Sequence, residues 1–411
     1  MSIPTNCGRM LRELMQAAHL ATLDDLPGLI ASHAARVGLR DVAVFAVDLQ
    51  EKVLRQLTGH GDDAGSGGEQ LNIDATVPGR AYQRVAVVTE TAREGQLRRW
   101  WVPVTDGVAR IGVLRADTAD GADPTEGDRE DRRQDLRDLA SLVALLLLSK
   151  QSFSDSFARL VRTEPMNVAA ELQWNLMPPS AYAGRDVTLG AMIEPAYEVG
   201  GDAFDYAVSG RTLHLSVFDA MGHDTTAGLT ATLTVAASRN ARRQGASLVE
   251  TSQAVEQLLT AHFGATRYVT GILADLDLDT GTLTWINRGH HLPLVVRDDR
   301  WTIELACPPA APMGTSLDLP VAVRHHQLQP GDRLLLYTDG IVEARDAEGH
   351  EFGRDRFVDF IVRHHSGHQT LHETLRRLMH AVVEHHAGHL DDDATVLLAE
   401  WRAGHQDKLM P

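Results

Sequence analysis

Apolar and polar residues follow two different spacings in the first third of the chain. From about Leu11 to Val37 the apolar positions recur every three or four residues, and Asp24 and Asp25 precede Leu26, which predicts helices. Short runs rich in β-branched residues then predict strands at residues 42–47, 52–57, 85–88, 100–104 and 110–115. We therefore expect a sheet flanked by helices in the first domain, residues 1–150.

A long helix is predicted to follow this sheet. Residues 139–148 are strongly apolar, and no proline or glycine then occurs until Pro165. Apolar positions recur at steps of three and four along this stretch, at Leu136, Leu139, Val143, Leu146, Leu147, Phe153, Phe157 and Leu160. Residues 139–148 fit a core helix of the first domain at least as well as a stalk. From Phe153 onward we favour a parallel dimer stalk that transmits a signal, within a helical linker of residues 151–180 that ends at Pro178.

The second half of the chain places aspartates at the ends of predicted strands. The strands are expected at residues 187–193, 212–218, 268–277, 282–287, 333–337 and 394–398. Asp202 follows two glycines, Asp219 ends the strand 212–218, Asp339 follows the strand 333–337, and Asp391–Asp393 precede the last strand. Four strand ends therefore each carry at least one carboxylate.

This set of carboxylates predicts a metal site. Each aspartate alone is more often part of a turn or a solvated cap than a ligand. Together they form an oxygen-rich site in a chain without a Gly-x-Ser-x-Gly nucleophile elbow, and such a site suits Mg²⁺ or Mn²⁺. Gly200 and Gly201 let the backbone approach an ion closely, and the main-chain carbonyl of Ala220 is a further candidate ligand. Carboxylates that bridge two ions would hold a water for in-line attack at phosphorus, so Asp202 and Asp219 are the candidate catalytic residues.

Two histidines near these motifs, His223 and His290, admit two interpretations. Either imidazole can orient a substrate phosphate or act as a general acid toward a leaving serine oxygen. The favoured interpretation for both is a structural histidine that bonds a loop carbonyl. The residues that bind substrate are unknown at this stage.

Composition and charge exclude several classes of function. The chain has 411 residues and a net charge of −17, which argues against nonspecific binding to nucleic acid or to an anionic membrane. Its two cysteines, Cys7 and Cys307, are too few for a disulfide framework or a thiolate zinc cluster. The longest apolar run, residues 142–148, is far shorter than the roughly 20 residues of a membrane span. We expect a cytoplasmic protein without a signal peptide.

The order of predicted elements in the first domain resembles that of a GAF domain. The resemblance covers about residues 20–150 and rests on a hairpin, the Val77–Tyr82 helix with its Pro-Gly-Arg start, the Trp101–Val104 strand and the Ile111–Leu114 strand. It implies a sensor that binds an unknown small ligand or serves as a dimerisation module. The sequence names no ligand.

The second half resembles the PPM-type metal-dependent serine/threonine phosphatases, in particular the bacterial SpoIIE/RsbU branch. The motifs that carry this resemblance are Glu198–Asp205, Asp219–His223, Asn287–His290, Pro312–Gly314, Tyr337–Ala344 and Asp392–Thr395. It implies an α/β/β/α sandwich in which Asp202, Asp219, the carbonyl of Ala220, Asp339 and Asp392 hold two Mn²⁺ or Mg²⁺ ions. Asp393 is the alternative to Asp392. Asp224 and Ala220 depart from the commonest family pattern, which puts the turnover rate in question.

The two resemblances together imply an α+β protein of two domains, with the phosphatase domain at residues 181–402 and a tail at 403–411. The implied function is dephosphorylation of a STAS-type anti-sigma-factor antagonist under control of the sensor, by a homodimer joined through the linker helix. One alternative is a catalytically silent binding protein of the same fold. Another is a hydrolase of small-molecule phosphoesters.

Overall fold

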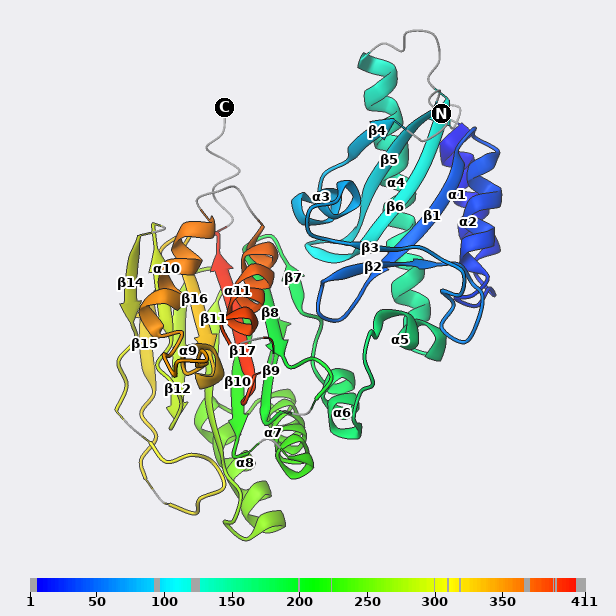
Figure 1. Ribbon diagram of the computed structural model, residues 1–411. Coiled ribbons are helices and arrows are strands. Elements are labelled where there is room, and N and C mark those ends of the chain that lie inside the picture. Colours follow the sequence, from blue (N-terminus) through cyan, green and yellow to red (C-terminus); the bar gives the residue numbers. More distant parts are fainter. Residues whose placement is uncertain are drawn as a thin grey trace. The chain divides into compact units, whose positions relative to one another are not determined.

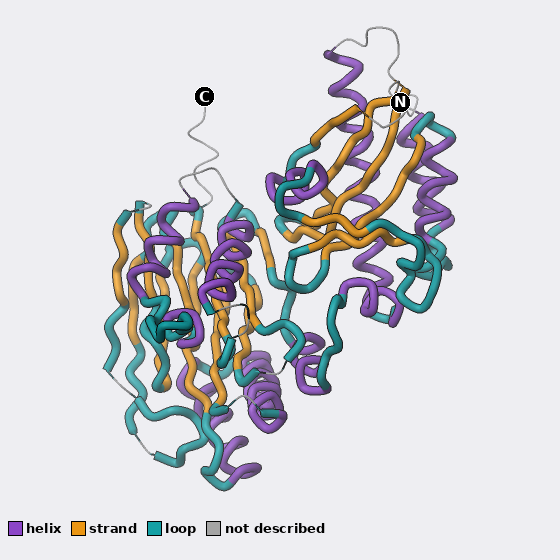
Figure 2. The backbone as a smooth tube through the Cα atoms, viewed as in Figure 1, coloured by secondary structure: helices purple, strands orange, loops and turns teal. Residues whose placement is uncertain are grey.

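The computed structural model describes residues 6–91, 97–119, 126–198, 200–222, 224–298, 300–308, 310–317, 319–365, 370–386, 388 and 390–403. The chain divides into two compact units, unit 1 from Met1 to Pro165 and unit 2 from Met166 to Pro411. The boundary falls inside residues 151–180, the stretch expected to link two domains. Each unit has its own sheet or sheets and its own hydrophobic core (Figures 1 and 2).

Within its described residues, unit 1 has a six-stranded antiparallel sheet with helices on both faces. The strands are β1 (Arg40–Val47), β2 (Val53–Leu57), β3 (Gln70–Asn72), β4 (Val88–Thr91), β5 (Leu97–Asp106) and β6 (Ala109–Ala119), in the order β3-β2-β1-β6-β5-β4. The helices are α1 (Asn6–Ala17), α2 (Leu26–Ala35), α3 (Val77–Arg84), α4 (Glu126–Gln151) and α5 (Asp155–Val161).

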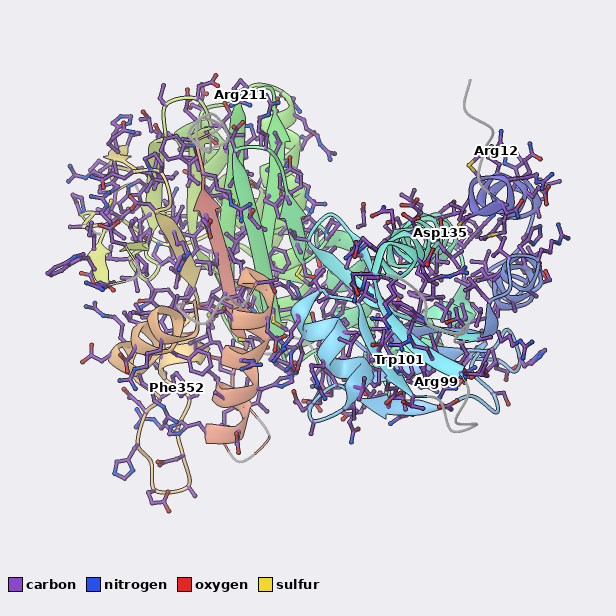
Figure 3. The ribbon with its side chains drawn as sticks, turned by 90° about the horizontal axis from the view of Figure 1, so that it is seen from above. Arg12, Arg99, Trp101, Asp135, Arg211 and Phe352 are labelled. Atoms are coloured by element: carbon purple, nitrogen blue, oxygen red, sulfur yellow. The ribbon has the colours of Figure 1, made fainter. Side chains whose placement is uncertain are left out.

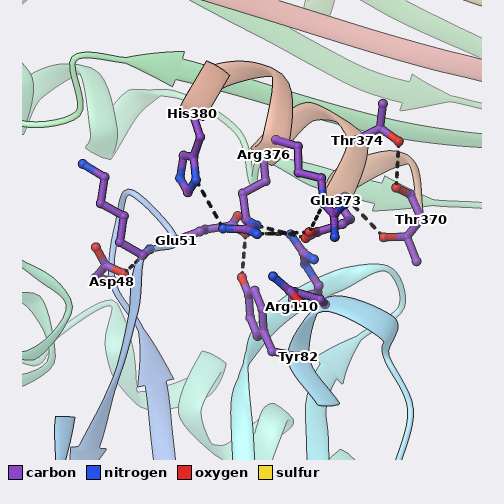
Figure 4. A network of polar contacts seen from close by, with 12 residues as sticks. Asp48, Glu51, Tyr82, Arg110, Thr370, Glu373, Thr374, Arg376 and His380 are labelled. Carbon is purple, nitrogen blue, oxygen red and sulfur yellow. Dashed lines mark hydrogen bonds and ion pairs between the residues drawn. The ribbon is translucent and has the colours of Figure 1, made fainter. Parts of the chain in front are cut away.

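The two faces of this sheet follow from the alternation of side chains along each strand. Val44 of β1 packs in the core formed with α1, α2, α4 and α5, whereas Phe45 belongs to the core on the α3 side. On that second face, Tyr82 Oη and Arg110 Nη2 each donate a hydrogen bond of 2.7 Å to Glu51 Oε2 (Figure 4). The Glu51 carboxylate on the α3 side of the sheet is thus paired with Arg110 of β6.

Polar and aromatic side chains of the neighbouring strands β5 and β6 also contact each other and β1. Arg99 of β5 donates from Nε and Nη2 to the two carboxylate oxygens of Asp117 on β6, at 2.9 and 2.8 Å. Trp101, two residues further along β5 (Figure 3), packs its ring 5.6 Å from that of Phe45. The sheet is therefore held by cross-strand ion pairs and aromatic contacts as well as by its hydrogen bonds.

The helix predicted to run out of the first domain is interrupted between α4 and α5. Ser154 caps α5, and its hydroxyl accepts a hydrogen bond of 3.2 Å from the Phe157 N–H. Phe157 and Leu160 are buried in the unit 1 core, and Arg55 Nη1 of β2 donates to the Leu160 carbonyl at 2.7 Å. The continuous stalk predicted from Phe153 onward is therefore wrong for α5, because a helix cap and core packing hold it on the sheet. The apolar face of α4, which runs from Leu136 to Leu147, is buried in the same core, as the core-helix interpretation expects.

Unit 2 contains two sheets. Strands β9 (Asp202–Ser209), β10 (Thr212–Ala220), β11 (Val269–Asp277), β12 (Thr282–Arg288) and β15 (Arg324–Gln327) form a five-stranded sheet in the order β15-β12-β11-β10-β9. Strands β7 (Ala181–Ala183), β8 (Val187–Glu194), β13 (Leu294–Arg297), β14 (Trp301–Glu304), β16 (Arg333–Tyr337) and β17 (Ala394–Trp401) form a six-stranded sheet in the order β14-β13-β16-β17-β8-β7. The helices are α6 (Val168–Leu176), α7 (Thr225–Arg243), α8 (Leu248–Phe263), α9 (Asp339–Val342), α10 (Arg354–His365) and α11 (Leu371–His385).

These two sheets pack face to face and carry helices on their outer surfaces. Leu215 of β10, Leu336 of β16 and Leu397 of β17 belong to one core between the sheets. Helices α7 and α8 share a second core with the outer face of the five-stranded sheet. Helices α9, α10 and α11 share a third core, which includes Phe352 (Figure 3), with the six-stranded sheet. The layers of unit 2 are thus α/β/β/α, the arrangement expected for the second half of the chain.

Five described strands of unit 2 were not expected from the sequence: β7, β9, β13, β14 and β15. Of these, β9 matters most for the site. β9 begins at Asp202, directly after the Gly200-Gly201 turn, and its partner β10 covers the predicted strand 212–218. The glycines mark the turn clearly, whereas the strand after them does not alternate cleanly and ends in exposed residues. Among the described helices, none combines the length and the apolar character needed to cross a membrane.

Candidate metal-dependent active site

Asp202 and Asp219 face each other across one strand pair. β9 and β10 are antiparallel, and their register sets the first residue of β9, Asp202, opposite Asp219 near the end of β10. The connecting turn contains Gly210, whose φ of +59° is a conformation that favours glycine. A short hairpin therefore brings both carboxylates to the same edge of the five-stranded sheet.

The six-stranded sheet supplies the other carboxylates from its central strands. Asp339 begins α9 just after β16, and Asp392 and Asp393 immediately precede β17. β16 and β17 are antiparallel neighbours with Tyr337 opposite Val396, so the end of one lies beside the start of the other. All of the strand ends predicted to carry ligands therefore converge in unit 2.

Two hydrogen bonds join the sheets at this point. The Asp202 N–H donates to Asp393 Oδ2 at 3.2 Å, and Thr338 Oγ1 donates to Asp202 Oδ2 at 2.6 Å. The Thr338 hydroxyl in turn accepts from the Thr395 N–H at 2.9 Å. The orientation of the Asp202 carboxylate is thus fixed by Thr338, which follows β16 and is itself held by Thr395 of β17.

Three glycines allow this close approach. A Cβ atom at Gly200 would lie 1.4 Å from Asp393 Oδ2, and one at Gly201 would lie 2.1 Å from the Ala220 carbonyl oxygen. A Cβ atom at Gly340 would lie 1.9 Å from the Asp393 carbonyl oxygen. No other residue fits at these positions without moving the backbone or a candidate ligand.

Burial and mutual repulsion perturb the titration of these carboxylates. Burial, followed by the charges of Asp393 and Asp219, raises the pKa of Asp202 well above its ordinary value. Burial, followed by the charges of Asp339 and Asp392, raises the pKa of Asp219 to about 7. Burial likewise raises the pKa of Asp393 to about 7, against the lowering effect of the hydrogen bond from the Asp202 N–H. The donors of the protein therefore do not balance the negative charge gathered here.

The donor set fits hard divalent cations. Carboxylate and carbonyl oxygens are the ligands that Mg²⁺ and Mn²⁺ prefer. A Cβ at Gly201 would lie 2.1 Å from the Ala220 carbonyl oxygen, so glycine at this position keeps a side chain away from that oxygen. Divalent ions would also balance the excess negative charge. The residues present thus fit the metal centre that the sequence predicts.

His290 lies beside the carboxylates and is held by its neighbours. Its Nε2 donates to the Tyr337 carbonyl at 3.0 Å, and its Nδ1 lies 2.7 Å from Thr270 Oγ1. Burial, together with the charge of His291, lowers the pKa of the His290 imidazole to about 3, so the ring is neutral near pH 7. A neutral ring that donates from Nε2 accepts at Nδ1, so the Thr270 hydroxyl donates to it. Asp219 Oδ2 is a second acceptor within reach of the same Thr270 hydroxyl, 3.4 Å away.

Asp224, directly after the Asp219–His223 motif, has a clear structural role. Asp224 is the N-cap of α7, and its Oδ1 accepts from the Ala227 N–H at 2.8 Å. Asp224 therefore starts a helix, which explains an acidic residue at a place where the sequence raised doubt. His223, the other candidate histidine, lies outside the described residues.

Sequence reasoning missed several residues that hold the site together. Asp205 is buried, and it accepts from Arg239 at 2.7 Å and from Arg242 at 3.0 Å, which ties β9 to α7. Gln173 of α6 donates from Nε2 to the carbonyls of Gly200 and Asp202, at 2.6 and 3.1 Å. Asp205 stands inside a recognised motif, whereas nothing in the sequence distinguishes Gln173 from a solvated helix residue.

Comparison with known proteins covers the same part of the chain. Residues 209–402 match the family described as Stage II sporulation protein E (SpoIIE). Phosphoserine phosphatase RsbU of Bacillus subtilis is 20% identical over 184 residues, which are 45% of this chain and 55% of that protein. Phosphoserine phosphatase RsbP of the same organism is 25% identical over 162 residues, which are 38% of this chain and 40% of that protein. The chain thus spans about half of the length of these relatives or less.

A solved structure is similar over a comparable share of the chain. The SiaA-PP2C domain of Pseudomonas aeruginosa has 23% sequence identity and a TM-score of 0.48, and the match covers 57% of this chain and 94% of that chain. The family match contains Asp219, Ala220, Asp339, Asp392 and Asp393, and it begins after Asp202. Residues 209–402 are therefore a SpoIIE-family domain, of the PPM type of serine/threonine phosphatase.

Proposed function

We propose that unit 2 is a metal-dependent protein serine/threonine phosphatase. The observation that carries this proposal is the convergence of carboxylates from two sheets at one point, joined by the Asp393–Asp202–Thr338 hydrogen bonds. Two Mn²⁺ or Mg²⁺ ions would be held by Asp202, Asp219, the Ala220 carbonyl, Asp339 and Asp392. When bound, the ions would neutralise the phosphoryl group and activate water for attack on it.

Exposure favours Asp392 over Asp393 as the last ligand. The Asp393 carboxylate is buried and is engaged by the N–H groups of Gly201 and Asp202. Asp392 is exposed, and its charge acts on Asp219. We therefore assign Asp392 to the metal and Asp393 to the support of the Gly201–Asp202 backbone.

The other polar residues of the site keep the candidate ligands in place. Thr338 fixes one oxygen of Asp202. His290 spans Thr270 of β11 and the carbonyl of Tyr337, and so links the strand beside Asp219 to the strand before Asp339. A neutral imidazole whose two nitrogens are both hydrogen-bonded acts as a structural group rather than as a general acid.

The proposed substrate is a phosphorylated STAS-type anti-sigma-factor antagonist. The similarity to two proteins named phosphoserine phosphatase supports a phosphoserine or phosphothreonine substrate. Unit 1, with a GAF-like order of elements, would be the sensor and would take an unknown small ligand. A homodimer joined through the part of the linker after α5 belongs to the same proposal, since α5 itself packs in the unit 1 core.

Control by the sensor would act through α6. Gln173 is buried and bonds the carbonyls on both sides of Gly201, so a shift of α6 would move the backbone that carries Asp202. Trp174 Nε1 also donates to the Ala196 carbonyl at 2.7 Å, which ties α6 to the chain just before the Glu198–Asp205 motif. We expect Gln173→Ala to lower turnover strongly and Asn175→Ala, an exposed change on the same helix, to leave it unchanged. Equal turnover of the two variants would remove α6 from the proposal.

Turnover with and without metal tests the proposed function. The wild-type protein is expected to release phosphate from an aryl phosphate and from phosphorylated STAS proteins only with Mn²⁺ or Mg²⁺, and Asp202→Ala and Asp339→Ala should abolish release. No metal-dependent turnover on any substrate would leave a silent binding protein of the same fold. Turnover of metabolite phosphates but of no phosphoprotein would instead point to a small-molecule phosphoesterase.

A further inference from the structure

One arginine contacts both ends of the turn that follows the candidate ligand Ala220. Arg267, two residues before β11, donates from Nη1 to the Met221 carbonyl at 3.1 Å. It also donates from Nη2 to Asp224 Oδ2 at 3.2 Å. The two bonds span Gly222 and the residue after it, so Arg267 closes this turn from the side of β11.

The direction of the Ala220 carbonyl follows from the bonds around it. The Met221 N–H donates to the Tyr268 carbonyl at 3.0 Å. Because the peptide group is planar and trans, the Ala220 carbonyl points away from Tyr268 and toward Gly201. The next carbonyl, that of Met221, is the one that Arg267 holds. Two successive peptide groups are therefore anchored on the residues just before β11, the first by the Tyr268 carbonyl and the second by the Arg267 side chain.

The turn has little stiffness of its own. Gly222 has a φ of +88°, and glycine can adopt many backbone conformations besides this one, so its own torsion angles do not hold the turn in place. At the far end, Asp224 is fixed to α7 through its cap bond to Ala227. Arg267 thus connects the flexible start of the turn to its fixed end.

This contact contributes little to folding. The side chain of Asp224 is 56% exposed and that of Arg267 is 24% exposed, and ion pairs of this kind add little to global stability. The effect of the contact is therefore expected in the geometry of the turn, where the nearest functional group is the Ala220 carbonyl.

We propose that Arg267, together with Asp224, is a positioning residue for the divalent metal centre and keeps the Ala220 carbonyl directed at the metal. The inference rests on the proposed function, because only there is this carbonyl a ligand. Partners that orient metal ligands typically change metal affinity by 10- to 100-fold when they are removed. Arg267 acts one residue away from the ligand, so we expect the lower end, about tenfold.

Calorimetric titration of the full chain with MnCl₂ measures this effect without turnover. We expect Arg267→Gln to raise the Mn²⁺ dissociation constant about tenfold, and Arg267→Lys to restore part of the affinity because lysine reaches one acceptor. Asp224→Asn keeps a helix cap but loses the ion pair, so its affinity should fall between wild type and Arg267→Gln. Arg211→Gln is the matched control, since Arg211 also contacts two carboxylates but sits in the turn at the opposite end of β10 (Figure 3).

The outcomes separate this inference from the proposed function. A dissociation constant for Arg267→Gln within about twofold of wild type overturns the positioning role and leaves the phosphatase proposal intact. An equal loss in Arg211→Gln overturns it as well, because the effect would then not depend on this turn. If Arg267→Gln fails to fold, wild-type affinity in both Arg267→Lys and Asp224→Asn overturns it. Failure of the wild-type protein to bind Mn²⁺ overturns the inference and the metal-dependent function together.

Discussion

Replacement of Gly201 by alanine tests the geometry of the site most directly. The added Cβ would lie 2.1 Å from the Ala220 carbonyl oxygen and 2.8 Å from the Gly222 carbonyl oxygen. Even a close C–H···O contact keeps carbon and oxygen about 3.3 Å apart, so the Ala220 carbonyl or β9 must move by about 1 Å. Both obstacles are backbone atoms, and no side-chain rotation relieves the overlap.

This displacement has a separate consequence for stability and for activity. Strain from an overpacked methyl group costs about 1–3 kcal/mol, which lowers Tm by roughly 2–12 °C in a domain of this size. A misplacement of about 1 Å at a reacting centre costs on the order of 100-fold in rate. We therefore expect Gly201→Ala to fold, to melt a few degrees lower and to lose about 100-fold in kcat/KM.

The assay is Mn²⁺-dependent hydrolysis of an aryl phosphate, with calorimetric Mn²⁺ titration and thermal denaturation of the same preparations. Gly28→Ala is the matched control, since a Cβ at Gly28 of α2 meets nothing within 4 Å and alanine is the better helix former. Wild-type metal affinity and turnover in Gly201→Ala would refute the argument that the Ala220 carbonyl must approach this closely.

Three further outcomes are expected. Asp205→Ala leaves Arg239 and Arg242 without their buried carboxylate and should lower the free energy of unfolding by about 3–5 kcal/mol. Asp279→Ala, which removes an exposed ion pair, should cost less than about 1 kcal/mol. Equal Tm values for the two variants would contradict this. Phe157→Ala should lower the free energy of unfolding by about 3–5 kcal/mol because α5 packs in the unit 1 core. Replacement of Phe153, whose side chain is 73% exposed, by alanine should lower it hardly at all. The reverse ranking would support the stalk that the sequence predicted. Mn²⁺ at about 100 times its dissociation constant should stabilise the wild-type protein by about 2.7 kcal/mol. This is measured as a rise in Tm that disappears when a chelator is added. A rise in Tm that is retained in Asp202→Ala would place the metal at another site.

The sequence by itself determined the features that depend on neighbours along the chain. Alternation of apolar residues identified β10 and β11, because side chains of a strand point to opposite faces with a period of two. Glycines beside Asp202 and Asp219 marked the places of close backbone approach, and the position of each aspartate at a strand end predicted where they would gather. These signals depend only on neighbouring residues, so they can be recognised without knowing how the elements pack.

Only the tertiary structure decided which groups meet across long separations. The sequence could not assign different tasks to Asp392 and Asp393, because the distinction rests on a hydrogen bond from Asp202, which lies in the other sheet. Likewise, Gln173 became a candidate link to the site only when α6 was placed against the Gly200 carbonyl. The stalk from Phe153 failed for the same reason. Helical spacing reports a buried face but not its partner, and here a serine cap and a core pocket in unit 1 supplied that partner.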